Sequence, residues 1–311
     1  MLVSNFRAMN SEIVLAAEGE TSQVESGFAT VQKFIDISEK RFTRFSDKSE
    51  LAQLNRSAGV WFQASPELFE VVQTAKLYFQ KTNGLFDPSI LPHLRNAGYV
   101  QSMDEIRRLG TTPGPASHSP ISVSSFASIG LNETDLSIRL PADLQIDLGG
   151  IAKGWIAEQA ARLLSQYAAA CAVSAGGDMF LIGYPEGQDH WEIGLEDPRD
   201  PQADISVLLL QEGAVATSSV AKRTWKQGKA SRHHLIDPRT GNPAETAWLS
   251  VTVLAPQAAA AETFAKAFLI ADKEEARILG EQNPELTVLA VDRDGNLISL
   301  VKPMESLNVT H

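Results

Sequence analysis

The segment Asp147-Leu-Gly-Gly-Ile-Ala-Lys-Gly154 joins the end of an apolar run to the start of a helical pattern. Glycines at such a junction leave backbone N–H groups exposed at the positive end of a helix dipole, which favours an anion. The segment therefore indicates a phosphate or pyrophosphate site. The alternative is a tight strand-to-helix connection that needs glycine for its backbone angles. The segment is not a Walker loop, because Gly154 rather than Ser or Thr follows Lys153, and it is not a Rossmann glycine turn.

Two further segments combine turn residues with groups that could do chemistry. Ser174-Ala-Gly-Gly-Asp178 follows a predicted strand, which fits either a ligand close to the backbone or a corner of the sheet. His234 precedes an apolar pair in a run of turn residues that includes Asp237. An imidazole titrates near neutrality and suits general-base catalysis. A structural, hydrogen-bonded His is the alternative.

Two other segments carry weaker signals of the same kind. Gly84-Leu-Phe-Asp-Pro-Ser89 places an aromatic ring beside a carboxylate after a helix. Ala216-Thr-Ser-Ser-Val220 places hydroxyl groups ahead of the cations Lys222 and Arg223, which suggests contact with an anion. Taken alone, the first fits a simple helix stop and the second a solvated strand end.

The spacing of apolar residues predicts the elements that would position these segments. We expect helices over residues 21–42, 66–82, 103–109, 155–169, 258–271 and 274–279. We expect strands over 11–18, 171–173, 179–182, 191–195, 205–210, 214–217, 249–254, 286–291 and 297–301, with two or three more within 121–147 and a surface loop over 111–120. Helices and strands mix without a strict βαβ repeat, which predicts an α+β fold with a mixed, largely antiparallel sheet and packed helices.

Composition narrows the class of protein. The 311 residues carry a net charge of −11, with 43% hydrophobic and 21% charged residues. An acidic surface argues against a nucleic-acid partner, and no apolar run is long enough for membrane insertion. Cys171 is the single cysteine, which excludes a disulfide within the chain and a cysteine-based metal site. The first residues lack the pattern of an export signal, so we expect a cytoplasmic protein.

Taken in order, these segments resemble the motifs of the ApbE family, the FAD:protein FMN transferases. The resemblance covers most of the chain. It also includes Arg7-Ala-Met9, the segment from Phe45 to Asn55 with Ser49-Glu-Leu51, and Leu85-Phe-Asp-Pro88. Any one motif could arise by chance, whereas the ordered set is specific.

The resemblance implies an ApbE-like (T-fold-like) single domain over residues 1–311, with two intertwined lobes and a ligand cleft between them. It implies an enzyme that cleaves FAD and attaches FMN by a phosphoester bond to a Thr or Ser of an acceptor protein, releasing AMP. Magnesium would assist. His234 would deprotonate the acceptor hydroxyl, with Asp237 as a second catalytic residue. The residues implied to bind FAD are Met9, Phe45, Leu85, Phe86, Asp87, Asp147, Gly149, Gly150, Trp155, Gly176, Gly177, Asp178, Ser218 and His234.

The implied metal site departs from the family's pattern. The family usually has an Asp and, four residues later, a Thr, on one face of a helix. Here Glu262 and Lys266 stand at those positions, and the carbonyl of Ala152 would be the third ligand. A charged Lys cannot ligate magnesium. Either Lys266 takes the place of the metal and pairs with Glu262 and the diphosphate, or a metal binds elsewhere with altered affinity.

Two alternative functions share the same motifs. One is a non-catalytic FAD-binding protein, and the other is an FAD pyrophosphatase that gives FMN and AMP without an acceptor. The pocket motifs support all three functions equally. The pair Glu262 and Lys266 favours the two alternatives, whereas His234 favours transfer.

Overall fold

The structure is a computed structural model, and its description covers part of the chain. The described residues are 1–109, 124–227, 230–301 and 309–310. They form two compact units, each assembled from separate stretches of chain. Unit 1 comprises Met1–Ile37, Lys153–Ala221 and Thr246–His311, and unit 2 comprises Ser38–Ala152 and Lys222–Glu245. The single domain over 1–311 and the cleft between two lobes stay predictions.

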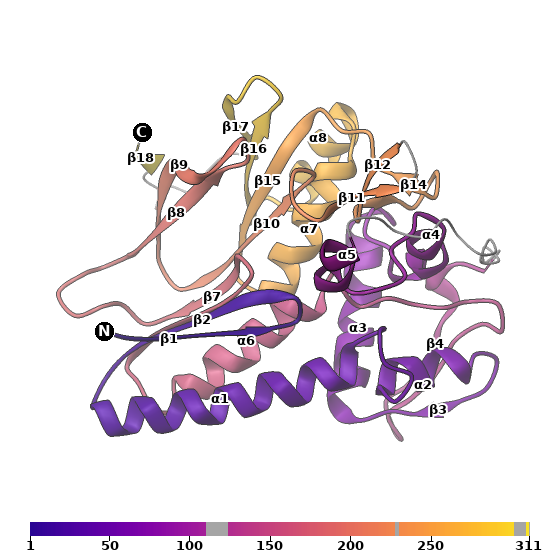
Figure 1. The fold of residues 1–311 in the computed structure, drawn as a ribbon, viewed down its shortest axis with the longest axis horizontal. Coiled ribbons are helices and arrows are strands. Elements are labelled where there is room, and N and C mark those ends of the chain that lie inside the picture. The colour runs from indigo at the N-terminus through magenta and orange to yellow at the C-terminus, as the bar shows by residue number, and fades with distance from the viewer. Residues whose placement is uncertain (110–123, 228–229, 302–308, 311) are drawn as a thin grey trace. The chain divides into compact units, whose positions relative to one another are not determined.

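Unit 1 is built on an eight-stranded sheet in the order β1-β2-β6-β7-β10-β15-β16-β17, and every neighbouring pair is antiparallel (Figure 1). Its strands are β1 (Leu2–Ala8), β2 (Ser11–Glu18), β6 (Ala170–Ala175), β7 (Asp178–Ile182), β10 (Gly213–Ser219), β15 (Trp248–Ala255), β16 (Thr287–Asp292) and β17 (Leu297–Val301). A smaller sheet has the order β18-β9-β8, with β8 (Trp191–Asp197), β9 (Asp200–Leu210) and β18 (Val309–Thr310).

The two faces of the large sheet have different covers. Helices α1 (Thr21–Phe42), α6 (Ala152–Leu164) and α7 (Ala258–Ile270) lie along one face (Figure 1). The apolar residues of β8 and β9 pack on the other face, where they meet Leu181 of β7. Side chains alternate along a strand, so Asp178 and Phe180 face the helices. The guanidinium carbon of Arg162 on α6 accordingly lies 5.3 Å from the centre of the Phe180 ring.

The last helix, α8 (Lys273–Gln282), packs against β17. It begins at a capping box in which Asp272 and Glu275 exchange hydrogen bonds between side chain and backbone. The following strands β16 and β17, at the positions of the last two predicted strands, pair as an antiparallel hairpin. The α+β class and the largely antiparallel sheet are therefore confirmed. Within the described ranges, no helix combines the length and apolarity needed to cross a membrane.

Apart from α3 (Pro66–Lys81), unit 2 consists of short elements. Its other helices are α2 (Glu50–Arg56), α4 (Leu91–Asn96) and α5 (Met103–Leu109), with the 3-10 turns η1 (Pro88–Ile90) and η2 (Phe126–Ser128). A three-stranded sheet has the order β3-β5-β4, from β3 (Phe62–Gln63), β4 (Gly130–Asn132) and β5 (Ser137–Arg139). Two hairpins pair β11 (Thr224–Gln227) with β12 (Ala230–His233), and β13 (Ile236–Asp237) with β14 (Asn242–Pro243).

The sequence predicted the long elements better than the short ones. Helices α1 and α3 occur as expected, and Ser65 caps α3 by accepting from the N–H of Leu68. Helix α6 begins at Ala152 rather than at Trp155, because the glycine segment already turns into the helix. Strand β1 and helices α2 and α4 were not predicted. The predicted loop over 111–120 lies outside the described residues.

Candidate functional site

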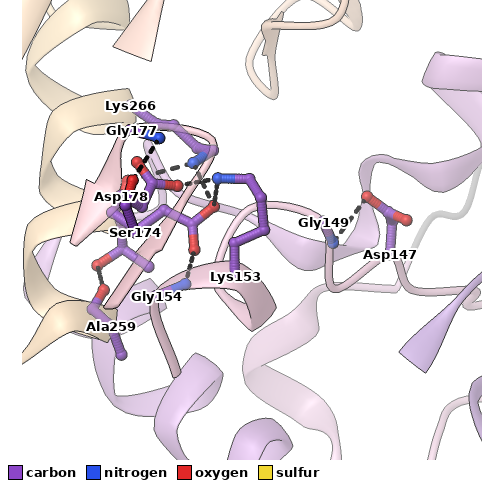
Figure 2. Close-up of polar contacts among 11 residues, drawn as sticks. Asp147, Gly149, Lys153, Gly154, Ser174, Gly177, Asp178, Ala259 and Lys266 are labelled. Atoms are coloured by element: carbon purple, nitrogen blue, oxygen red, sulfur yellow. Dashed lines mark hydrogen bonds and ion pairs between the residues drawn. The ribbon is translucent and has the colours of Figure 1, made fainter. Parts of the chain in front are cut away.

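Four charged side chains meet in unit 1, and Figure 2 labels three of them, Lys153, Asp178 and Lys266. Lys153 lies in the first turn of α6, Asp178 opens β7, and Glu262 and Lys266 lie one turn apart on α7. The Nζ atoms of Lys153 and Lys266 each lie 3.1 Å from Oε1 of Glu262. Lys153 also pairs with Asp178. We call these four residues the ammonium–carboxylate cluster; three of them were predicted site residues, and Lys153 was not.

Close packing of two helices positions this cluster. A Cβ on Gly154 would lie 2.5 Å from the carbonyl oxygen of Ala258, so a side chain there would push α6 away from the start of α7. The N–H of Gly154 donates to Oε2 of Glu262 at 2.8 Å. Nearby, Oε2 of Glu158 accepts from the N–H of Ala258 at 2.9 Å, which satisfies one of the open donors of α7. Glu262 is thus held by regular structure, not by a loop.

Glu262 is ionised although its side chain is only 1% exposed. Burial alone raises the pKa of a carboxyl group. Here the charges of Lys153 and Lys266 and the N–H of Gly154 outweigh burial and hold the pKa of Glu262 at about 2. The cluster therefore contains two positive and two negative charges. Removing any one would leave a charge uncompensated in a partly buried place.

The donors around Glu262 do not fit the magnesium site that the resemblance implies. Oε1 already faces two ammonium groups, and Oε2 accepts from a backbone N–H. The Lys266 ammonium stands at the position of the usual Thr ligand and has no lone pair to offer. Ala152, whose carbonyl is the third implied ligand, is the first residue of α6. Among the residues that the structure describes, no three His, Cys, Asp or Glu side chains are grouped for a metal.

Two tight hairpin loops lie side by side at one end of the unit 1 sheet. Met9 and Asn10 join β1 to β2 with φ of 54° and 55°, and Gly176 and Gly177 join β6 to β7 with φ of 67° and 95°. Positive φ at both residues of a two-residue loop matches the twist of a hairpin. A Cβ on Gly176 would lie 2.7 Å from Oγ of Ser11, whereas a Cβ on Gly177 would meet no described atom within 4 Å. The glycine pair therefore forms a corner of the sheet whose second residue is open.

Strand register brings Ser218 to the same end of the sheet, whereas Trp155 lies on helix α6. Because Val215 of β10 pairs with Met179 of β7, the chain of β10 reaches Ser218 just beyond the glycine loop. Ser218 is buried. Trp155 is buried on α6, with its ring centre 6.3 Å from that of Phe34 on α1. Met9, the glycine loop, Asp178 and Ser218 thus share one end of the sheet, while Trp155 packs between helices.

In unit 2, Asp147 is held by its own loop and by an arginine. Its Oδ2 accepts from the N–H of Gly149 at 3.1 Å, and its Oδ1 lies 3.3 Å from Nε of Arg44. Gly150 continues the same turn into α6. The guanidinium of Arg44 lies 4.3 Å from the centre of the Phe45 ring and 4.4 Å from that of Tyr99. We call Arg44, Phe45, Tyr99 and Asp147 the Arg44 group.

Sequence reasoning found half of the Arg44 group. Phe45 and Asp147 were predicted, whereas Arg44 and Tyr99 were not. Arg44 could have been found as the neighbour of Phe45 in a motif, but Tyr99, whose carbonyl accepts from Arg44 at 2.8 Å, lies 55 residues away. The Tyr99 ring stacks on Trp225 at 5.2 Å. Burial raises the pKa of the Tyr99 hydroxyl, although Arg223 and Arg44 oppose that shift.

The Leu85-Phe-Asp-Pro88 segment lies next to the Asp147 loop in unit 2. Leu85 and Phe86 are buried. Asp87 begins the turn η1, and its Oδ1 accepts from the N–H of Ser89 at 2.7 Å and from its hydroxyl at 2.6 Å. Burial raises the pKa of Asp87 despite these bonds. The carbonyl of Pro88 accepts from the N–H of Asp147 at 2.8 Å, so two predicted motifs meet through their backbones.

His234 precedes the β13–β14 hairpin, and Asp237 is the last residue of its first strand, β13. His234 is half-buried. The carboxylate of Asp237 accepts from the N–H of Arg239 at 2.9 Å, from its Nε at 2.9 Å and from its Nη2 at 2.8 Å. Burial would raise the pKa of Asp237, but the bonds from Arg239 lower it. Asp237 thus closes the hairpin, while the catalytic roles of both residues stay predictions.

Comparison with known proteins identifies the family of this chain. The sequence model of the ApbE family matches residues 9–290. The FAD:protein FMN transferase of Treponema pallidum (strain Nichols) is 27% identical over 291 residues, covering 88% of this chain and 79% of the relative.

Two solved structures have the same fold. An ApbE protein from Thermotoga maritima superimposes with a TM-score of 0.80 at 23% identity and covers 96% of each chain. The flavin transferase ApbE from Vibrio cholerae superimposes with a TM-score of 0.76 at 19% identity, again over 96% of each chain. Because the family match spans most of the chain, this protein belongs to the ApbE family.

Proposed function

We propose that this protein is an FAD:protein FMN transferase that attaches FMN to a Thr or Ser of an acceptor protein. The observation that carries the proposal is the family match over residues 9–290, together with the ordered motifs. Relatives over most of the chain's length, including those of Treponema pallidum and Klebsiella pneumoniae, are named FAD:protein FMN transferase.

The reaction is a phosphoryl transfer with a protein hydroxyl as the nucleophile. The hydroxyl oxygen forms a bond to the phosphorus of the FMN half of FAD, and the bond from that phosphorus to the AMP phosphate breaks. The hydroxyl proton passes to a ring nitrogen of His234, and AMP leaves with the bridging oxygen. Such a step needs an aligned nucleophile and positive charge near the diphosphate. His234 supplies the base, and the cationic residues near the glycine segment supply the positive charge.

FAD is the proposed substrate, and the residues given above as its binding residues stay predictions. Two properties of the structure support them. Met9, Gly176, Gly177, Asp178 and Ser218 share one end of the unit 1 sheet. Within unit 2, Phe45 and Asp147 meet around Arg44. The implied magnesium site is not part of this proposal, because the donors at Glu262 do not fit it.

A direct assay tests the function. The purified protein is incubated with FAD and an acceptor domain that carries a flavinylation-type Thr, and AMP and acceptor mass are followed by mass spectrometry. Equal amounts of AMP and FMN-bearing acceptor are expected, and a Thr→Ala acceptor gives neither. FMN and AMP without modified acceptor would identify a pyrophosphatase instead. FAD that stays bound and intact would identify a flavin-binding protein.

We also propose a cytoplasmic location without a nucleic-acid partner. The net charge of −11 opposes binding to a polyanion, and the single cysteine fits a reducing compartment, where disulfides are rare. Cys171 is buried, which raises the pKa of its thiol to about 12 and keeps it unreactive. Cell fractionation with an antibody would test the location.

A further inference from the structure

Lys266 places a positive charge where this family's sequence pattern has an oxygen ligand. Its Nζ lies 3.1 Å from Oε1 of Glu262 and donates to the backbone carbonyl of the same residue at 3.3 Å. The two residues are four apart on α7, so one helical turn fixes the pair. Lys153 approaches the same Oε1 from α6 at 3.1 Å.

We infer that Lys266 is a built-in cation that replaces the divalent metal, so that this protein handles a diphosphate with two ammonium groups and no divalent ion. The inference rests on the proposed function for the identity of the anion, which is the diphosphate of FAD. The exclusion of the metal rests on the ammonium–carboxylate cluster alone.

The cluster has neither the ligands nor the charge for a divalent metal ion. Magnesium requires a near-octahedral set of oxygens at about 2.0–2.1 Å. Oε1 of Glu262 faces two ammonium groups and Oε2 is occupied by the N–H of Gly154. A divalent ion at Oε1 would lie a few ångströms from two like charges, which repel it strongly in a partly buried place. Asp178, the other acid of the cluster, already pairs with Lys153.

The two ammonium groups can supply what a metal would supply to the substrate. The metal's part in phosphoryl transfer is to neutralise charge on the phosphate oxygens. A lysine ammonium does so as a compact point charge. The side chains of Lys153 and Lys266 keep 14% and 15% exposure, whereas Glu262 keeps 1%. The carboxylate is therefore sealed behind two cations that an anion can approach.

Metal binding is measured first, without FAD or acceptor. Mn²⁺ is titrated into the wild type, Lys266→Thr and a control, Lys273→Thr, and free Mn²⁺ is followed by electron paramagnetic resonance. Lys273 is an exposed lysine at the start of α8. Lys266→Thr removes one ammonium and adds a hydroxyl ligand, so it should bind one Mn²⁺ at least tenfold more tightly than the wild type. Lys273→Thr should match the wild type.

The inference is overturned if the wild type binds one Mn²⁺ as tightly as Lys266→Thr, or if Lys266→Thr gains no affinity. Circular dichroism shows whether Lys266→Thr folds. Should it not fold, the wild type decides: AMP release from FAD in excess EDTA should stay within twofold of the rate in excess Mg²⁺, and a tenfold loss in EDTA overturns the inference.

The two proposals fail in different ways. If the wild type releases no AMP under any condition, the proposed function fails, while the Mn²⁺ titration still decides the nature of the Lys266 site. If the wild type transfers FMN only with Mg²⁺ present, the proposed function stands and the built-in cation is refuted.

Discussion

The ammonium–carboxylate cluster of unit 1 and the Arg44 group of unit 2 both pair positively charged side chains with carboxylates, but they are built differently. In the cluster, two point charges from α6 and α7 converge on one oxygen of Glu262. In the Arg44 group, one planar guanidinium lies against two aromatic rings and touches Asp147 with its edge. The first arrangement is positioned by helices, and the second by connecting segments.

The difference separates charged groups held by regular structure from charged groups held by connecting segments. Regular elements hold a constellation more precisely than loops do, and loops more often carry binding and catalytic groups. The cluster is satisfied internally, which suits a permanent electrostatic role. The unit 2 residues, His234 among them, lie on turns and short hairpins. We therefore expect substitution of Glu262 to cost stability first, and substitution of His234 to cost activity first.

The largest effect is expected in unit 2, at His234. His234→Ala removes the proposed general base, so FMN transfer should fall by about 10²–10⁴-fold, while FAD affinity changes by less than about threefold. Single-turnover flavinylation and FAD fluorescence titration measure the two quantities. The loop variant His190→Ala, at a residue outside the predicted site, is the control and should keep wild-type rates. Loss of FAD binding in His234→Ala would instead give His234 a structural or FAD-binding role.

In unit 1, the matching substitution is Glu262→Gln. It leaves two ammonium groups against a neutral amide, and breaking a buried ion pair from one side typically costs about 3–5 kcal/mol. Urea denaturation should show this loss as a lower midpoint with little change in slope. The control is Glu274→Gln on the exposed face of α8, which should leave the midpoint nearly unchanged. Equal midpoints for both variants would show that the cluster is not a stabilising unit.

The pH dependence of stability should have opposite signs at two carboxylates, one in each unit. The pKa of Glu262 is lowered from 4.5 to about 2, so its stabilising contribution is present above pH 4.5 and is lost as pH falls through about 2. The pKa of Asp87 is raised above 3.8, so its contribution is present below pH 3.8 and is lost as pH rises through the folded-state pKa.

Urea midpoints measured between pH 2 and 7 test this contrast. The penalty of Glu262→Gln should shrink on acidification from pH 4.5 towards 2. The penalty of Asp87→Asn should shrink in the opposite direction, as pH rises above 3.8. Penalties that change in the same direction would mean that the two carboxylates do not have opposed environments.

The sequence predicted the large sheet and its long helices because these elements repeat a period several times. Helix α1 shows Val24, Phe28, Val31 and Ile35 on one buried face, and its bounds were predicted correctly. Helices α2 and α4 have seven and six residues, too few for the period to stand out. Within 121–147, strands β4 and β5 have only three residues each, too few for an alternation of apolar and polar residues to stand out. Their pairing with each other defines them.

The candidate site was predictable where a motif is local and not where it depends on tertiary contact. Asp178 and Glu262 followed from ordered motifs. The meeting of Lys153 with Glu262 spans more than a hundred residues and depends on how closely Gly154 lets α6 approach α7. Tyr99 carried no signal, and its stacking on Trp225 arises only through folding. Their types alone could not distinguish a binding group from core packing.

The smallest expected effects come from two substitutions of glycine by alanine, one in each unit, within the same glycine segment. A Cβ on Gly154 would lie 2.5 Å from the backbone oxygen of Ala258, which cannot move without shifting a helix. Gly154→Ala should therefore cost about 1–3 kcal/mol of unfolding free energy, as overpacking does. A Cβ on Gly149 would lie 2.9 Å from Oδ2 of Asp147, a side-chain atom that can rotate aside.

Gly149→Ala should therefore cost less than about 1 kcal/mol, within the range of substitutions that disturb no buried contact. Urea denaturation of both variants measures the difference, and FAD titration of Gly149→Ala shows whether turning Asp147 away from its loop weakens binding. A larger stability loss at Gly149 than at Gly154 would reverse the comparison. It would mean that the Asp147 loop, and not the contact of α6 with α7, is the more tightly constrained end of the segment.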